Sequence, residues 1–231
     1  MKKAAIILAG GEGLRAGGGE PKQFRMLQGK PALWWSLKAF HDEDPATRLI
    51  VVIHPNFITE WENTIADLEP HERFEQTIVC GGKSRWHSVY NALLEISGDD
   101  ELYIAVHDGA RPLITPAMIS RGWECALKND SAIPAIPLSD SIRHLTSQHD
   151  SHSVARKDYV AVQTPQIFKS EIIKRAYAQP ESPDFTDDAS VVEALGLSVS
   201  LYDGEPDNIK ITYPRDLQVA CIIMNSQSPK L

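Results

Sequence analysis

Residues 3–25 of the chain read KAAIILAGGEGLRAGGGEPKQFR, which joins a strand-like run to a loop rich in glycine. The apolar run over residues 3–8 predicts a buried strand. Six of the chain's fourteen glycines follow it, between Gly10 and Gly19. Glycine tolerates unusual backbone angles, and successive N–H groups of such a loop can converge on an anion. Because Arg15 and Lys22 accompany the loop, this stretch is suited to binding a polyphosphate.

Other interpretations of the loop fit the residues less well. It is not a P-loop, because Gly29-Lys30-Pro31 lacks the Ser or Thr that closes that motif. Gly11-x-Gly13-x-x-Ala16 matches a loose dinucleotide-binding pattern, but the glycine run and Pro21 interrupt the helix that this pattern requires. The next strand-like run ends at His54 instead of an acidic residue. A solvated glycine loop without a ligand is the remaining alternative.

The composition is that of an ordinary globular protein, with 42% hydrophobic and 23% charged residues among 231. A net charge of −8 argues against nucleic-acid binding, although a nucleotide needs only a local group of cations. Cys80, Cys125 and Cys221 are far apart, which is typical of a reducing cytosol and not of a disulfide framework or zinc site. The apolar runs are too short for a signal peptide or a membrane span. We therefore expect a cytoplasmic protein.

Strand-like and helix-like segments alternate along the chain. This rhythm predicts an α/β fold of the Rossmann-like kind, with a mainly parallel sheet and helices on both faces. The expected strands after the first are 49–53, 77–80, 102–106, 132–136 and 197–202. The expected helices are 31–40, 57–68, 84–96, 116–128, 169–177, 186–195 and 214–225, with Ser84 and Thr115 as N-caps and Pro116 and Pro214 at first helical positions.

The alternation stops at about residues 138–162. This stretch is polar and lacks a long apolar face, so it predicts a protruding β-arm and not a second domain. We expect residues 1–231 to form a single domain that carries this arm. His149-x-x-His152 within it is more typical of surface histidines than of a metal site.

The motifs resemble those of a known family. Leu8-Ala9-Gly10-Gly11-x-Gly13-x-Arg15, followed by Pro21-Lys22-Gln23, is similar to the signature of sugar-phosphate nucleotidyltransferases. Gly81-Gly82-x-x-Arg85-x-x-Ser88-Val89 and His107-Asp108-Gly109-Ala110-Arg111-Pro112 narrow the resemblance to the branch that acts on 2-C-methyl-D-erythritol 4-phosphate. The resemblance extends from about residue 4 to residue 220. It implies a cytidylyltransferase that transfers CMP from CTP to this polyol phosphate and releases pyrophosphate, in the non-mevalonate synthesis of isoprenoid precursors.

The resemblance also implies roles for the nucleotide-binding residues. Arg15 and Lys22 would be catalytic, because nucleotidyl transfer depends mainly on positioning and on neutralising charge that builds up in the transition state. The backbone of the two glycine segments and the Ser88 hydroxyl would hold CTP. These segments contribute Ala9, Gly10, Gly11, Gly13, Gly81 and Gly82. The family commonly has Glu where this chain has Ser84, and some relatives have an acid where it has Lys83.

Asp108 follows a predicted strand and would bind Mg²⁺, which proteins usually hold with one or two carboxylates and substrate phosphates. The remaining implied roles concern the acceptor. In this family the arm crosses to a second subunit, so a homodimer is expected. The acceptor-binding positions that match this chain are Ser141, Arg156, Lys210, Arg111 and Thr186.

Three other functions remain possible on the sequence. The same transfer could use ribitol 5-phosphate or another polyol phosphate. An NAD-dependent dehydrogenase is a second possibility, and a non-catalytic nucleotide-binding protein is a third.

Overall fold

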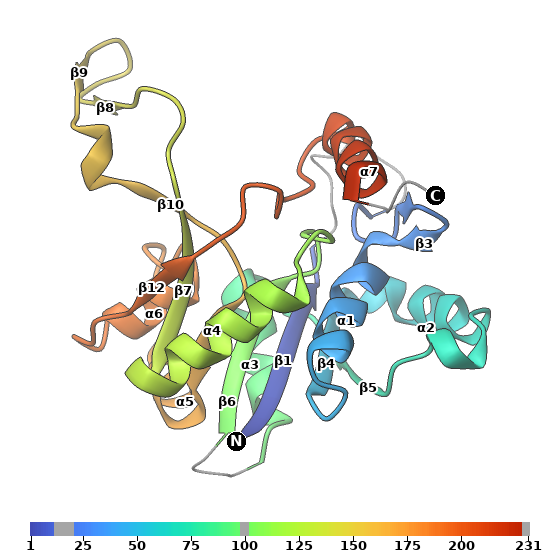
Figure 1. Ribbon diagram of the computed structural model, residues 1–231. Helices are drawn as coiled ribbons and strands as arrows, with labels where there is room; N and C mark the ends of the chain where they lie inside the picture. The colour runs from blue at the N-terminus through green and yellow to red at the C-terminus, as the bar shows by residue number, and fades with distance from the viewer. Residues whose placement is uncertain (12–20, 98–101, 228–231) are drawn as a thin grey trace.

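The computed structural model describes residues 1–11, 21–97 and 102–227, and its centre is an eight-stranded sheet (Figure 1). The strand order is β10-β7-β11-β6-β1-β4-β5, and β12 pairs with β7. Neighbours β6, β1, β4 and β5 run parallel, whereas β11 runs antiparallel between β6 and β7. The strands are β1 Lys2–Ala9, β4 Arg48–Ile53, β5 Gln76–Cys80, β6 Leu102–Asp108, β7 Ser131–Pro137, β10 Val160–Val162, β11 Gln166–Lys169 and β12 Leu201–Asp203. The predicted α/β class with a mainly parallel sheet is confirmed.

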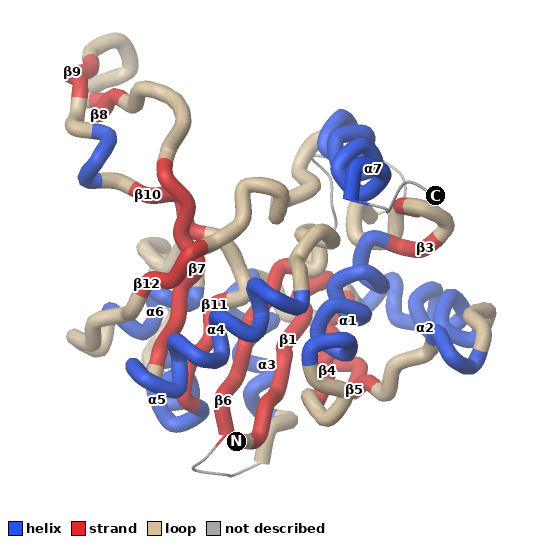
Figure 2. Tube along the Cα trace, viewed as in Figure 1, coloured by secondary structure: helices blue, strands red, loops and turns tan. Residues whose placement is uncertain are grey.

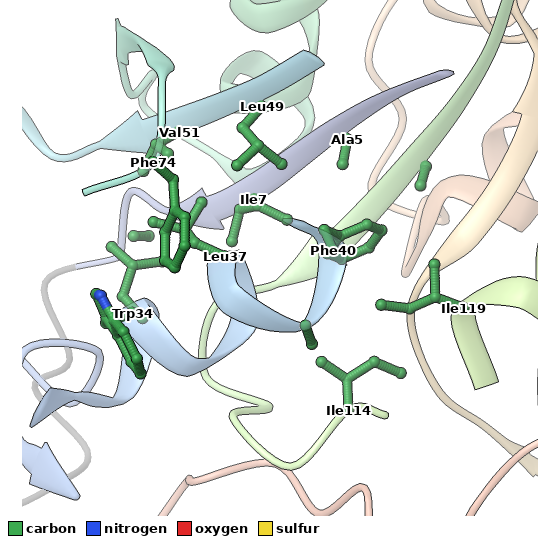
Figure 3. Packing of buried hydrophobic residues seen from close by; sticks show 14 of the residues in the cluster. Ala5, Ile7, Trp34, Leu37, Phe40, Leu49, Val51, Phe74, Ile114 and Ile119 are labelled. Carbon is green, nitrogen blue, oxygen red and sulfur yellow. The ribbon is translucent and has the colours of Figure 1, made fainter. Parts of the chain in front are cut away.

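Helices cover both faces of the sheet. On one face lie α1 (Ala32–Glu43), α2 (Ile58–Ala66) and α4 (Pro116–Asn129), and on the other lie α3 (Arg85–Leu94), α5 (Ser170–Tyr177) and α6 (Asp188–Glu193). Figure 3 shows Ile7 of β1 and Leu37 and Phe40 of α1 packed together in the first of these cores. Full burial of each such large apolar side chain contributes roughly 1.5–3 kcal/mol. The two cores together fix the carboxyl ends of the parallel strands.

Helix caps agree with most of the predicted boundaries. The Ser84 hydroxyl accepts from the backbone N–H of His87 and begins α3, and the Thr115 hydroxyl accepts from that of Met118 and begins α4. The final helix, α7, begins at Pro214 as predicted and extends to Gln227. The helix expected from residue 186 begins later, because Asp187 is the N-cap and accepts from the backbone N–H of Ser190.

Several strands differ from the prediction. Strand β11 was not predicted, because its four residues lead directly into α5 and show no alternation. The strand expected over 197–202 is shortened to β12, since Leu197 and Val199 pack against the core beneath α5 and α6 instead of joining the ladder. Two short strands, β2 (Met26–Leu27) and β3 (Lys30–Pro31), form a separate ladder before α1.

The predicted arm stands away from the sheet (Figures 1 and 2). It carries the hairpin of β8 (Arg143–Leu145) and β9 (Ser151–Ser153) and a 3-10 turn at Arg156–Asp158. Its last residues depart from the expectation, because β10 pairs with β7 and so belongs to the main sheet. In the described part of the chain, no helix has the length and apolar character needed to span a membrane.

Candidate active site

A cleft of about 840 Å³ opens where the parallel strands end. Ligands of open α/β sheets bind at this carboxyl edge, and the volume is typical of a small-molecule site. It brings together many residues singled out in the sequence, although they lie up to about 200 positions apart. Of the predicted site residues, the following line the cleft: Ala9, Gly10, Gly11, Lys22, Gly82, Ser88, Asp108 and Lys210. Gln23, His54, Lys83, Ser84, Arg85, Ala110 and Thr212 also contribute, together with Leu8.

The first wall of the cleft is the end of β1 and the start of the glycine loop. Gln23 is buried there, with 2% of its surface exposed. Its side-chain amide donates to the carbonyl of Ala9 at 2.8 Å and to that of Gly11 at 3.1 Å. Gln23 therefore ties the residues after the loop to those that enter it, a role the sequence motif did not reveal. Arg15 and Gly13 lie outside the described residues.

The second wall is the turn at Gly81-Gly82. A Cβ on Gly81 would lie 3.2 Å from the Cα of Gly10, and one on Gly82 would lie 2.4 Å from the Cβ of His87. A side chain at Gly82 would therefore clash with His87, whereas one at Gly81 would crowd the backbone of Gly10. Gly82 lines the cleft, and Gly81 stands behind it against Gly10.

Ser88 holds this turn through its hydroxyl. The oxygen accepts from the backbone N–H of Gly82 at 3.1 Å and donates to the carbonyl of Ser84 at 2.9 Å. A hydroxyl has one donor and two acceptor lone pairs. The Ser88 oxygen thus has one lone pair left, and toward a ligand it can act only as an acceptor.

Asp108 projects from the end of β6 into the cleft among cations. Lys210 Nζ lies 2.7 Å from its Oδ2, and the Nε atoms of Arg85 and Arg111 each lie 3.8 Å from a carboxylate oxygen. Burial alone would raise the pKa of Asp108, but Arg85, Lys210 and Arg111 outweigh burial and hold the pKa well below its usual range. The carboxylate is therefore ionised at neutral pH.

A buried chain of hydrogen bonds supports Asp108 from behind. The backbone N–H of Asp108 donates to Thr164 Oγ1 at 3.0 Å, and Thr164 Oγ1 lies 3.2 Å from Nδ1 of His107. Nε2 of His107 lies 3.2 Å from the carbonyl of Arg111, which can only accept. These partners assign the proton of the neutral ring to Nε2 and make Nδ1 the acceptor. Burial lowers the pKa of His107 to about 4, so the ring is neutral near pH 7.

Arg111 joins the two segments that carry Asp108 and Lys210. Its Nη1 donates to the carbonyl of Asn208 at 2.7 Å, and the amide of Asn208 donates to the carbonyl of Thr164 at 3.0 Å. Arg111 is not among the residues that line the cleft. The structure thus gives it a part in orienting Lys210, while its predicted contact with the acceptor stays a prediction.

Three predicted acceptor-binding residues lie apart from the cleft of their own chain. Ser141 and Arg156 are exposed on the arm, where the Arg156 guanidinium donates to the carbonyl of Ser139. Thr186 is exposed before α6, and its backbone N–H donates to Ser190 Oγ at 3.0 Å. None of the three lines the cleft.

Sequence reasoning assigned no role to an ion pair between Arg85 and Asp188. Arg85 belongs to a predicted nucleotide-binding motif, and Asp188 lies in the first turn of an expected helix, where an acidic residue is ordinary. No local signal could have joined two residues separated by 103 positions.

The donor set of the cleft fits one kind of metal. Among the described residues, no three Asp, Glu, His or Cys side chains converge as an all-protein metal site. Asp108 alone offers an ionised carboxylate among the residues described at the cleft wall. Mg²⁺ is commonly bound by one or two carboxylates together with substrate phosphates and water. The residues present therefore fit a Mg²⁺ that arrives with a polyphosphate.

Comparison with known proteins connects this cleft to a family. The sequence profile of 2-C-methyl-D-erythritol 4-phosphate cytidylyltransferases matches residues 3–226. The chain belongs to this family. The family member of that name from Bacteroides fragilis is 42% identical over 225 residues, which covers 97% of this chain and 100% of the relative.

Solved structures of similar proteins share the fold of this chain. The 2-C-methyl-D-erythritol 4-phosphate cytidylyltransferase from Thermus thermophilus superposes with a TM-score of 0.74 at 29% identity, covering 97% of this chain and 100% of that one. The 4-diphosphocytidyl-2C-methyl-D-erythritol synthase from Anaerococcus prevotii gives 0.81 at 23% identity, covering 97% and 98%, and supports the fold. Because the family consists of nucleotidyltransferases, the dehydrogenase and the non-catalytic interpretations are set aside.

Proposed function

We propose that this protein transfers CMP from CTP to 2-C-methyl-D-erythritol 4-phosphate and releases pyrophosphate, as a step of isoprenoid precursor synthesis in the cytoplasm. The observation that carries the proposal is the cleft itself. It joins a glycine loop, Lys22 and an ionised Asp108 at one sheet edge, in a chain that matches the cytidylyltransferase family over nearly its whole length.

The donor nucleotide fits the wall built from Gly81-Gly82 and Ser88. The Ser88 hydroxyl can still accept one hydrogen bond, so it suits a ligand group that donates a hydrogen bond. The 4-amino group of cytosine donates, whereas the corresponding oxygen of uracil accepts. The backbone of Ala9, Gly10 and Gly11 supplies further contacts, and Gly13 would extend that loop.

In the reaction, an oxygen of the acceptor phosphate attacks the α-phosphorus of CTP, and the bond from that phosphorus to the β-phosphate oxygen breaks. The pyrophosphate leaves with its electron pair. Negative charge builds on the oxygens around phosphorus, so fixed cations lower the barrier. Lys22 lines the cleft at the glycine loop and takes this role together with Arg15. Asp108 would hold Mg²⁺, which when bound neutralises phosphate charge.

The acceptor requires cations of its own, because its phosphate must approach an anionic triphosphate. Lys210 supplies one at the cleft, and Arg111 orients the segment that carries it. We assign Ser141 and Arg156 to the acceptor site of a second subunit in a homodimer, and Thr186 to a hydroxyl contact. The support for this assignment is that the arm stands away from the sheet, lends no residue to the cleft lining of its own chain, and exposes Leu145 and Tyr159.

A pyrophosphate-release assay tests the proposal. We expect turnover with CTP and 2-C-methyl-D-erythritol 4-phosphate in the presence of Mg²⁺, and its loss in EDTA. UTP and ATP in place of CTP, and ribitol 5-phosphate or erythritol 4-phosphate in place of the acceptor, serve as comparisons. Equal turnover with UTP would contradict the assignment of the base, and faster turnover with ribitol 5-phosphate would replace the named acceptor.

A further inference from the structure

A buried carboxylate holds Arg85 in the cleft. Nη1 of Arg85 donates to Oδ1 of Asp188 at 3.0 Å, and Nη2 donates to Oδ2 at 2.6 Å. The hydroxyl of Tyr177 donates to the same Oδ1 at 2.7 Å. Asp188 is 0% exposed and Tyr177 is 2% exposed. A bidentate pair with a third donor fixes the plane of the guanidinium as well as its position.

The other edge of Arg85 faces the reaction site. Arg85 is the first residue of α3, three positions after Gly82, and it lines the cleft. Its Nε lies 3.8 Å from Oδ1 of Asp108. A guanidinium has five N–H donors, and Asp188 takes two of them, so three are left for other partners. Lysine could not reproduce this arrangement, because an ammonium lacks the planar fork.

We propose that Asp188 and Tyr177 are positioning residues for the nucleotide donor. They fix Arg85 so that its remaining N–H groups meet oxygen atoms of the nucleotide beside Asp108. Both are too deeply buried to touch the nucleotide themselves, so they act through Arg85. The inference rests on the proposed function in that it takes CTP as the donor.

The chain contains a matched control at the opposite edge of the sheet. Glu43 lies at the end of α1, and one of its oxygens is 2.9 Å from Nζ of Lys3, near the start of β1. Its other oxygen accepts from the indole N–H of Trp123 at 3.0 Å. This site, like that of Asp188, combines a carboxylate, a cation and an aromatic donor, and 9% of the Glu43 side chain is exposed. It lies at the amino ends of the strands, away from the cleft.

The first experiment compares Asp188→Asn, Tyr177→Phe and Glu43→Gln. CTP binding is titrated calorimetrically with Mg²⁺ and without acceptor, and Tm and the KM for each substrate are measured. Asp188→Asn should weaken CTP binding and raise the KM for CTP by at least about tenfold, by analogy with the loss of a partner that orients a metal-binding side chain. The KM for the acceptor at saturating CTP should stay within about twofold. Tyr177→Phe should weaken CTP binding about threefold, as expected for one hydrogen bond. Glu43→Gln should lower Tm yet leave CTP affinity unchanged.

The second experiment asks whether Asp188 acts through Arg85. In an Arg85→Gln background, Asp188→Asn should cause no further loss of CTP affinity, because coupled residues are not additive. An equal further loss would overturn the inference, as would an Asp188→Asn protein with a lower Tm and wild-type CTP affinity. If Asp188→Asn does not fold, Tyr177→Phe decides: weaker CTP binding at a wild-type Tm supports the inference, and wild-type binding overturns it. The turnover of the wild-type protein is measured separately. If the wild type binds CTP but transfers no CMP, that result contradicts the proposed function and not the role of Asp188.

Discussion

The ammonium of Lys210 lies 2.7 Å from Oδ2 of Asp108. The lysine side chain is 42% exposed and the aspartate 13%, so the lysine is the partner with room to move. A Mg²⁺ ion that bound Oδ2 of Asp108 would compete with Lys210 for that oxygen. Metal binding would thereby free a cation at the point where the acceptor phosphate must arrive.

Replacing this lysine should affect the acceptor more than the donor. In Lys210→Met, kcat/KM for 2-C-methyl-D-erythritol 4-phosphate should fall at least about tenfold, which corresponds to ~1.4 kcal/mol of transition-state stabilisation. CTP affinity measured in Mg²⁺ without acceptor should be unchanged or slightly tighter. Lys38→Met is the control, since Lys38 pairs with Asp42 on the surface of α1 at similar exposure. A loss of CTP affinity in step with activity would show that Lys210 serves the donor.

Lys22 lines the cleft at the glycine loop, and removing its charge should slow the chemical step. We expect Lys22→Ala to lower kcat by at least about 100-fold, as for one lost preorganised donor in a transition state. Arg15→Ala should have a similar effect. Both proteins should keep a wild-type Tm, and Lys128→Ala, on the exposed side of α4, should keep full activity. Near-normal kcat in Lys22→Ala would move the reaction centre elsewhere.

The projecting arm predicts assembly. Light scattering should give twice the mass of one chain, because the arm stands away from its own sheet and presents Leu145 and Tyr159 to a second subunit. Arg156→Ala and Lys22→Ala chains should each be inactive alone. When they are mixed and allowed to exchange, activity should return, since one of the two composite sites in a mixed dimer is then intact. A fully active monomer, or mixtures that stay inactive, would contradict this arrangement.

His107 should make stability depend on pH. Its pKa in the folded protein, about 4, lies below its ordinary value of 6.5 because the ring is buried. The neutral ring therefore stabilises the fold fully above pH 6.5, and this contribution is lost as the pH falls from 6.5 toward 4. The loss is on the order of 3 kcal/mol over that interval. Asp108, whose pKa is also lowered, adds to the loss only at still lower pH.

Urea unfolding of wild type, His107→Asn and His149→Asn between about pH 7 and 4.5 measures this dependence. His107→Asn should be less stable at neutral pH, because Thr164 and the carbonyl of Arg111 lose their partner, but its stability should fall less steeply with pH. His149 is exposed on the arm, so His149→Asn should follow the wild type. Parallel curves for all three proteins would refute the assignment.

The parts of this structure that sequence could predict are those with local causes. Apolar runs indicated the strands of the parallel sheet, and Ser84 and Thr115 marked the first turns of α3 and α4 through side chains that cap nearby N–H groups. Sequence analysis assigned the two glycine segments and Asp108 to nucleotide and metal binding, and the cleft brings Gly10, Gly82 and Asp108 together.

The parts that could not be predicted depend on contacts between distant segments. Strand β11 is defined by its neighbours β6 and β7 and has no periodicity of its own. Asp188 looks like an ordinary helix-start acid until the fold places Arg85 against it. Gln23 likewise gains its role only through its bonds to the carbonyls of Ala9 and Gly11. In each case the information lies in pairing and burial, which a linear pattern does not encode.

The pairing of Pro137 with Val160 means that the arm leaves and re-enters the sheet at facing positions. Residues 138–159 are thus an excursion whose two ends the sheet holds together. Closing a flexible loop twice as long costs only about 0.6 kcal/mol more. The β8–β9 hairpin at its tip can therefore be lengthened or trimmed without shifting the register of the strand that delivers Asp108. Such changes would alter the surface that the arm presents, while the cleft of the same chain and the flanking Ser141 and Arg156 keep their places.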